Sequence, residues 1–313
     1  MSIVEPVVLL VVGFVMLIKG ADWFVEGASK IADRFGIPQL VIGLTIVAMG
    51  TSAPEAAVSI ASALKGSAEI TIGNVLGSNI LNVLVILGMT AVVRAIAVQK
   101  STIKYEIPFT IFVTVLLGVL GLSDGVISRA EGVVFWAFFI VYLLYLFKMA
   151  KDGQQEAEET KKEEKKDSML KLILLVIIGV VLIVFGSDVS VEAATDLAKI
   201  FGMSERLIGL TIVALGTSLP ELVTSVTAAI KGKADIAVGN IVGSNLFNIL
   251  FVVGTTALIT PVAYSANFMV DTITAVAAMV LLFICVLPKK KLNRPAGAIM
   301  LVGYVAYFIY LIQ

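Results

Sequence analysis

Long apolar segments joined by short polar connections recur along the whole chain. Each segment holds about 20 mainly apolar residues, which is enough for a helix to cross the roughly 30 Å hydrocarbon core of a bilayer. Apolar residues surround each segment on all sides, whereas a soluble helix would keep one polar face. Ten membrane-spanning helices are therefore predicted, at residues 4–28, 37–64, 70–93, 106–122, 126–148, 169–197, 204–230, 236–259, 267–287 and 295–312.

Composition supports the membrane interpretation and narrows the chemistry. Of 313 residues, 59% are hydrophobic and 15% charged, against about 25% charged residues in ordinary soluble domains. There is no histidine, and the single cysteine, Cys285, cannot form an intrachain disulfide. The start, MSIVEPVVLL, lacks the basic region of a cleavable signal peptide. We expect a multi-pass protein of the cell membrane that is not an enzyme, binds no nucleic acid and needs no cofactor.

The distribution of charge along the connections predicts an orientation. The longest polar stretch, KDGQQEAEETKKEEKKD at 151–167, has no apolar face and is expected to be a solvated, partly disordered loop. Most Lys and Arg residues lie in the connections after the first, third, fifth, seventh and ninth predicted helices. Because positively charged connections remain in the cytoplasm, the 151–167 loop is predicted to be cytoplasmic and both termini extracellular.

An internal repeat divides the chain into two halves. A shift of 166 residues places IGLTIVAMGTSAPE (42–55) on IGLTIVALGTSLPE (208–221), and GNVLGSNILN (73–82) on GNIVGSNLFN (239–248), without a gap. Five predicted helices separate each residue from its equivalent, and five is odd, so the second half is inverted in the membrane. The sequence predicts an all-α membrane protein of two inverted five-helix repeats, 1–150 and 168–313, with repeated motifs at 43–82 and 209–248. Such repeats are typical of secondary transporters with a shared midplane site.

Each repeated motif places a carboxylate inside a predicted membrane helix. Glu55 and Glu221 lie well within the apolar segments 37–64 and 204–230, and a carboxylate there is costly unless it serves a site. Pro54 and Pro220 precede them and remove a backbone donor, so we expect both helices to be broken at these points. Broken helices with released carbonyl groups are a common way to bind cations in transporters.

Only oxygen atoms are available as ligands around this predicted site. Besides the two carboxylates, the motifs supply hydroxyl and amide groups, and the pairs in the third and eighth helices are four residues apart, hence on one helical face. These candidate ligands are Thr51, Ser52, Thr217, Ser218, Ser78, Asn82, Ser244 and Asn248. Hard oxygen ligands favour Ca²⁺, Na⁺ or Mg²⁺ over zinc or copper, and flexible sites of this kind favour Ca²⁺ over Mg²⁺.

Other repeated residues have simpler structural interpretations. Ser59, Ser225 and the paired glycines of the motifs are expected to serve helix packing. Two further asparagine pairs, Asn74 with Asn240 and Asn79 with Asn245, are expected to brace the helix breaks, with direct binding of the ion as the less favoured alternative.

The two G-T-S-x-P-E phrases and the two G-S-N-x-x-N phrases resemble the paired motifs of the calcium/cation antiporter superfamily, with the prokaryotic sodium/calcium exchangers as the most similar branch. The resemblance extends over all ten predicted helices. It implies that Glu55 and Glu221 are the central Ca²⁺ ligands and also bind Na⁺. It also implies supporting ligands from the other candidates and from the carbonyl groups of Ala48 and Ala214. The first and sixth helices would slide over the others to alternate access.

The chain departs from some of these relatives at two points. The potassium-dependent branch has Asp where this chain has Asn248, which argues against K⁺ transport. The 151–167 loop is also far too short to contain the Ca²⁺-sensing domains of animal exchangers.

Three functions remain open at this level. Ca²⁺/Na⁺ antiport by alternating access is favoured, in a chain that needs the lipid bilayer but implies no protein partner and is compatible with a monomer. Ca²⁺/H⁺ antiport is the alternative, because a buried carboxylate can take up a proton. A passive cation channel is disfavoured by the inverted repeat and by the absence of a ring-like carbonyl filter motif.

Overall fold

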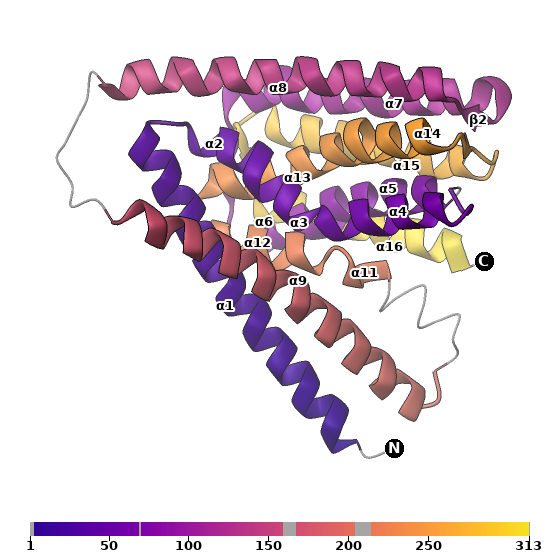
Figure 1. Cartoon of the computed structure of the whole chain (residues 1–313), viewed down its shortest axis with the longest axis horizontal. Coiled ribbons are helices and arrows are strands. Elements are labelled where there is room, and N and C mark those ends of the chain that lie inside the picture. The colour runs from indigo at the N-terminus through magenta and orange to yellow at the C-terminus, as the bar shows by residue number, and fades with distance from the viewer. Residues whose placement is uncertain (1–2, 69, 159–166, 204–213, 313) are drawn as a thin grey trace.

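The computed structural model describes residues 3–68, 70–158, 167–203 and 214–312, and this part of the chain is a helical membrane protein (Figure 1). Within these ranges, eight helices are long and apolar enough to span a bilayer, and a bent pair raises the number to nine. The single long helices are α1 (Val4–Phe35), α8 (Arg129–Glu158), α9 (Met169–Ile200), α15 (Phe268–Val286) and α16 (Arg294–Ile312).

The other membrane segments are interrupted by breaks or by wider turns of π-helix, labelled η. The bent pair comprises α2 (Gln39–Ile42), η1 (Gly43–Val47) and α3 (Ala48–Thr51), followed by α4 (Ala53–Leu64) at an angle of 49°. Its counterpart has α11 (Ala214–Gly216) before α12 (Leu219–Ile230). The remaining segments are α5 (Ile70–Leu81) with η2 (Asn82–Leu87) and α6 (Gly88–Val93), η3 (Thr102–Glu106) with α7 (Ile107–Asp124), and α13 (Ala234–Phe247) with η5 (Asn248–Val253) and α14 (Gly254–Ile259).

Most of these elements coincide with the helices expected from the sequence, but two helices end later than expected. Helix α1 continues to Phe35 instead of ending at 28, and α8 continues to Glu158, so the 151–167 loop begins as helix. The stretch 151–158 is rich in Gln, Glu, Lys and Ala, which are good helix formers, so the solvated loop starts later than expected. Residues 204–213, the beginning of the expected helix 204–230 and of the motif 209–248, lie outside the described residues.

Helices α1 and α9 form an antiparallel pair that lies obliquely against the other helices (Figure 1). A Cβ atom on Gly13 would lie 2.9 Å from the carbonyl oxygen of Gly186, and one on Gly20 would lie 2.8 Å from that of Gly179. The reverse contacts are the same within 0.1 Å, since Cβ atoms on Gly186 and Gly179 would each lie 2.9 Å from the oxygens of Gly13 and Gly20. The two backbones therefore touch along a symmetric seam, because small residues let membrane helices approach closely.

The third and eighth membrane segments form the centre of the molecule. In the most apolar window of Ala234–Ile259, 94% of residues are buried inside the protein, and in that of Ile70–Val93 the share is 78%. The corresponding shares for α1, α8, α9, α15 and α16 are 17–33%, so these helices face the lipid. The repeated GSN phrases thus lie on the two most enclosed segments.

Two short antiparallel ladders join connections from different halves. Strand β1 (Ile96–Ala97) pairs with β4 (Lys291–Leu292), with Ile96 opposite Leu292. Strand β2 (Val126–Ile127) pairs with β3 (Val262–Ala263), with Ile127 opposite Val262. Because β1 precedes η3–α7 and β2 follows it, the two ladders lie at opposite ends of this membrane segment.

Candidate cation site

Both proline-containing phrases form a sharp break between two helical pieces. Ser52 separates α3 from α4 with φ −84° and ψ 7°, and Ser218 precedes α12 with φ −94° and ψ 3°. A proline occupies the first turn after each break, where its missing N–H is not needed. Glu55 and Glu221 lie in these first turns, so the positive ends of two helix dipoles face the carboxylates.

The two carboxylates are enclosed and largely without hydrogen-bond partners. Glu55 is 1% exposed and Glu221 is 0% exposed. Neither oxygen of Glu55 has a partner, whereas Oε1 of Glu221 accepts a hydrogen bond from Ser52 Oγ at 2.8 Å and Oε2 has none. Glu55 follows Ser52 by three residues, and the Ser52 hydroxyl binds Glu221. No ion pair among the described residues includes either carboxylate. Such an arrangement favours a cation between them.

Two asparagine side chains provide further unsatisfied oxygens. Asn82 and Asn248 are the first residues of η2 and η5, and π-helical turns often occur at functional positions. Both are buried, and the Oδ1 atom of each has no hydrogen-bond partner. The α12 helix, which carries Glu221, packs against η2, and the α4 helix, which carries Glu55, packs against η5. Each carboxylate helix thus contacts the asparagine segment of the other half.

The hydroxyl candidates are divided between free and engaged groups. Ser218 Oγ is buried without a partner, and Thr217 lies beside it in the turn before α12. Thr51 Oγ1 lies 3.1 Å from the carbonyl oxygen of Val47 and 3.0 Å from Asn240 Oδ1. Ser78 and Ser244 are buried on α5 and α13.

The carbonyl groups before the breaks also differ between the halves. The Ala48 oxygen accepts the Ser52 N–H at 3.0 Å and the Ser244 hydroxyl at 3.4 Å, so it is engaged in this conformation. In the second half the Ser218 N–H bonds to the Leu215 oxygen at 3.2 Å, one residue beyond Ala214. The second break is therefore tighter than the first.

Asn74 and Asn240 hold the breaks in place, as expected for bracing residues. Asn74 Nδ2 donates to the backbone oxygen of Glu55 at 3.2 Å and to Ser59 Oγ at 3.0 Å. Asn240 Nδ2 makes the equivalent bonds to Glu221 at 3.4 Å and Ser225 at 2.9 Å. Ser59 and Ser225, expected to serve only packing, are thus acceptors that anchor these amides.

The burial of a third carboxylate, that of Glu106, was not predicted from the sequence. Glu106 is 1% exposed at the end of η3, and one of its oxygens accepts a hydrogen bond from the Tyr145 hydroxyl of α8. The sequence places Glu106 at the boundary of an apolar segment, where a solvated position is the ordinary expectation. A tyrosine in the following helix was the only available signal of its burial.

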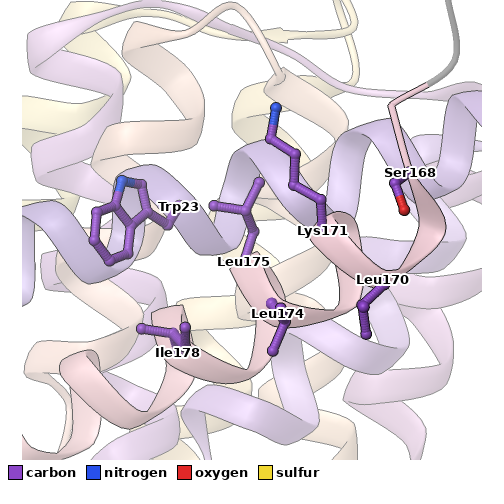
Figure 2. Close-up of a pocket in the computed structure, with 7 residues that line it drawn as sticks. All are labelled: Trp23, Ser168, Leu170, Lys171, Leu174, Leu175 and Ile178. Carbon is purple, nitrogen blue, oxygen red and sulfur yellow. The ribbon is translucent and has the colours of Figure 1, made fainter.

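A surface pocket lies elsewhere, between α1 and α9, and Figure 2 shows the residues that line it. Its lining is mostly apolar, with Trp23 from α1 and Leu174, Leu175 and Ile178 from α9. The one charged lining group, Lys171, forms an ion pair with Asp167 at 2.9 Å. Without a carboxylate in its lining, this pocket cannot replace the enclosed site as a cation site.

The enclosed oxygens, on broken helices within an apolar bundle, define a membrane protein that handles bare cations. Among the described residues, no group of three or more acidic, histidine or cysteine side chains could bind a metal, and the candidate ligands other than the two carboxylates are neutral oxygens. Mobile substrate ions fit such a site better than a permanently bound metal.

Comparison with known proteins identifies the family. The chain belongs to the sodium/calcium exchanger family, which it matches over residues 5–148 and 171–313. It is 40% identical over 308 residues to the putative antiporter CaxA of Alkalimonas amylolytica, covering 96% of each chain. It is 35% identical to the sodium/calcium exchanger MaX1 of Methanosarcina acetivorans, covering 97% of each. The fold matches the solved structure of the sodium-calcium exchanger NCX_Mj with a TM-score of 0.84 at 30% identity, over 99% of this chain and 100% of that one.

Proposed function

We propose that the protein exchanges Ca²⁺ for Na⁺ across the cell membrane by alternating access to one site between its two halves. The observation that carries this proposal is a set of buried oxygens without hydrogen-bond partners on segments of the two halves that pack against one another. Two come from Glu55 and one each from Glu221, Asn82 and Asn248. Two carboxylates balance one Ca²⁺, and the neutral oxygens complete the six to eight ligands that Ca²⁺ takes.

The proposed architecture has ten membrane helices in two inverted five-helix repeats, separated by the 151–167 loop. The equivalent bonds of Asn74 and Asn240 and the symmetric glycine seam of α1 and α9 support this interpretation. Both termini would be extracellular and the loop cytoplasmic. In Figure 1 the start of α1 and the end of α16 point toward one end of the molecule, and the end of α8 and the start of α9 lie toward the other.

The proposed cation ligands come from both halves of the chain. It consists of the side chains of Glu55, Glu221, Thr51, Ser52, Thr217, Ser218, Ser78, Ser244, Asn82 and Asn248, with the carbonyl groups of Ala48 and Ala214. In a given access state some of these groups bind the ion while others, such as the Ala48 carbonyl here, are held by hydrogen bonds.

Ca²⁺ flux into proteoliposomes tests the proposal. Purified protein is reconstituted with Na⁺ inside, and ⁴⁵Ca²⁺ uptake is measured after dilution into Na⁺-free buffer or into buffer of equal Na⁺ concentration. Uptake should require the outward Na⁺ gradient and should stop when the gradient is collapsed by a Na⁺ ionophore. Uptake that ignores Na⁺ would contradict the proposal.

Proton coupling is the second candidate, and the unpaired carboxylates favour it. Glu55 and Glu221 are buried, and three of their four carboxylate oxygens have no hydrogen-bond partner, so a proton could take the place of a metal ion there. An imposed pH gradient that drives ⁴⁵Ca²⁺ uptake in the absence of Na⁺ would establish this function in place of Na⁺ exchange.

A further inference from the structure

Four asparagine side chains, two from each half, form a set of hydrogen bonds between the third and eighth membrane segments. Asn79 Nδ2 donates to the backbone oxygen of Asn245 at 3.2 Å, and Asn245 Nδ2 donates to the backbone oxygen of Asn79 at 3.3 Å. Asn79 and Asn245 are 3% and 1% exposed. These two bonds cross the interface between the halves in both directions.

The backbone acceptors fix the orientation of every amide in the set. A carbonyl oxygen can only accept, so the NH₂ ends of Asn79 and Asn245 must point toward the two backbone groups. Their side-chain oxygens are therefore available as acceptors on the opposite side. Asn245 Oδ1 accepts from Asn82 Nδ2 at 3.0 Å, and Asn79 Oδ1 accepts from Asn248 Nδ2 at 3.2 Å.

This arrangement determines which atom Asn82 and Asn248 present to the site. Their NH₂ groups are bound by the partner half, so their Oδ1 atoms are left buried without partners. A buried acceptor without a partner is unfavourable, unless a cation fills its place. An amide that turned over would present NH₂ hydrogens, which repel a cation.

We propose that Asn79 and Asn245 are positioning residues for ion binding. Asn79 holds the amide oxygen of Asn248 toward the transported cation, and Asn245 does the same for Asn82. This inference rests on the proposed function, because the orientation of these amides matters only if the site binds a cation. It assigns a role to two residues that do not touch the ion.

The crossed pairing makes the inference testable. Asn79→Ala should raise the half-saturating Ca²⁺ concentration about tenfold, the equivalent of roughly 1.4 kcal/mol. Asn79→Ala combined with Asn248→Ala should have little further effect, because both remove the same oxygen from the site. Asn79→Ala combined with Asn82→Ala should be additive, since these residues belong to different pairs. A merely structural role for Asn79 would not distinguish Asn248 from Asn82.

Controls separate this effect from misfolding and from failure of the proposed function. The exposed Asn267→Ala should leave the half-saturating Ca²⁺ concentration unchanged. Folding of each variant is checked by size-exclusion chromatography and thermal melting. A parent that exchanges Ca²⁺ with no shift in Asn79→Ala, or additivity in both pairs, would overturn the inference. A parent that neither binds nor exchanges Ca²⁺ would overturn the proposed function itself.

A second observation concerns interactions that one half makes and the other does not. Lys231, in the turn after α12, forms an ion pair with Asp22 of α1 at 2.6 Å and donates to its backbone oxygen at 2.9 Å. The shift of 166 residues relates this pair to Lys65 and Asp188. Both of these residues are described and exposed, and no ion pair joins them.

The same asymmetry recurs at the site. The 2.8 Å bond from Ser52 to Glu221 has no counterpart from Ser218 to Glu55, whose oxygens are unpartnered in the described structure.

A third interaction between the halves also lacks its equivalent. The 3.0 Å bond from Thr51 to Asn240 is present, whereas its equivalent from Thr217 to Asn74 is not among the hydrogen bonds of the described residues. All three interactions therefore join a residue of the first half (Asp22, Ser52 or Thr51) to the second half, and none has its equivalent in the described structure.

The packing of α1 and α9 explains why these differences occur together. The seam between the two helices is symmetric, but their contacts with the other helices are not. Helix α1 packs along α12, whereas α9 makes no comparable contact with its equivalent, α4. Because the contacts between α1 and α9 are symmetric while their contacts with the other helices are not, the two helices are displaced together relative to the rest of the molecule.

We infer that Asp22–Lys231 and Asp188–Lys65 are alternative ion pairs that close opposite sides of the membrane in turn. Lys231 and Lys65 follow equivalent helices of inverted halves, so the two pairs lie on opposite faces. When α1 and α9 move, Asp22 separates from Lys231, and Asp188 meets Lys65. This inference rests on alternating access but predicts a contact that this conformation does not contain.

Disulfide cross-linking tests this exchange of partners. In a chain with Cys285→Ala and a protease site between α8 and α9, Asp22→Cys is combined with Lys231→Cys, or Lys65→Cys with Asp188→Cys. Cleaved fragments remain joined on a non-reducing gel only if the disulfide has formed. Both pairs should cross-link, each cross-link should stop ⁴⁵Ca²⁺ exchange until reduction, and ions that increase one should decrease the other.

Two outcomes would overturn the ion-pair exchange. One is the absence of the 65–188 cross-link in a protein that exchanges Ca²⁺ and forms the 22–231 cross-link. The other is simultaneous formation of both cross-links in one molecule. If the cysteine-free parent did not transport Ca²⁺ at all, the proposed function would fail instead.

Discussion

Ser52 of the first half donates a 2.8 Å hydrogen bond to Oε1 of Glu221 in the second half. The break between α3 and α4 therefore contacts the carboxylate of the opposite break directly. A change at either residue should therefore be felt in both halves.

Neutralising either carboxylate should abolish Ca²⁺ exchange. Glu55→Gln or Glu221→Gln leaves one charge to compensate for the dehydration of a divalent ion, and losing one partner of a buried charge pair costs about 3–5 kcal/mol, equivalent to a loss of at least 100-fold. The measurement is Na⁺-dependent ⁴⁵Ca²⁺ uptake in proteoliposomes, with the exposed Glu5→Gln as control. Transport retained by either variant would mean that the cation binds elsewhere.

Asn248→Asp should change which ions are exchanged. The substitution adds a third carboxylate where the structure has an unpartnered amide oxygen, so it should strengthen binding of Na⁺ and alter the number of Na⁺ ions per Ca²⁺. Parallel ²²Na⁺ and ⁴⁵Ca²⁺ fluxes give this ratio, with Asn267→Asp as an exposed control. An unchanged ratio would assign Asn248 to packing.

Ser52→Ala and Ser218→Ala should differ in stability although the residues are equivalent in sequence. Ser52→Ala removes a hydrogen bond to a buried carboxylate and should lower the free energy of unfolding by about 1.5–3 kcal/mol. Ser218→Ala removes a hydroxyl without a partner and should be neutral or slightly stabilising. Thermal melting of both proteins in Ca²⁺-free detergent compares them, and equal melting temperatures would contradict the asymmetry.

Gly20→Ala should disturb the contact between α1 and α9. The added methyl group would lie 2.8 Å from the Gly179 oxygen, so the helices must separate, at about 1–3 kcal/mol. Gly303→Ala on α16 is the matched control, because its methyl group would make only ordinary contacts with Leu84. The control should be stabilised by about 0.5–1 kcal/mol through reduced chain entropy. Equal effects on melting would contradict a tight seam.

The ion pairs of Asp167 should contribute stability only above a low pH. Hydrogen bonds from Lys30 and then Lys171 lower the pKa of Asp167 from 3.8 to about 2. The lowered pKa means that this contribution is complete above about pH 4 and is lost as the pH falls through 2. Asp167→Asn should therefore lower the melting temperature slightly at pH 7, less so in high salt. A difference that grew on acidification below pH 4 would contradict this assignment.

Much of the fold was accessible from the sequence because hydrophobic length determines where membrane helices lie. The α5–η2–α6 segment ends at Val93, as expected, since Arg94 cannot enter the hydrocarbon. The predicted end of α8 at residue 148 was wrong. Hydropathy marks where the apolar residues stop, whereas helix propensity extends the helix to Glu158. Ten helices and their inverted arrangement stay predictions, because residues 204–213 lie outside the described ranges.

At the site, the sequence indicated the oxygen-bearing residues but not their partners. Repetition singled out Glu55 and Glu221, and their burial follows from their position in apolar segments. The crossed bonds of Asn79 and Asn245 could not be foreseen, because they depend on how the two halves face one another. The same holds for Glu106, whose burial depends on Tyr145 in another helix. The roles of these residues in ion binding stay predictions.

The two strand ladders have a mechanical consequence. They fasten the halves at opposite ends of the η3–α7 segment, and the asparagine bonds fasten them between those ends. These connections should keep the two halves of the central bundle from sliding past one another. In the proposed function, the α1–α9 pair is the part that moves. In that function, the energy of the ion gradient would then move two helices, with little deformation of the central bundle.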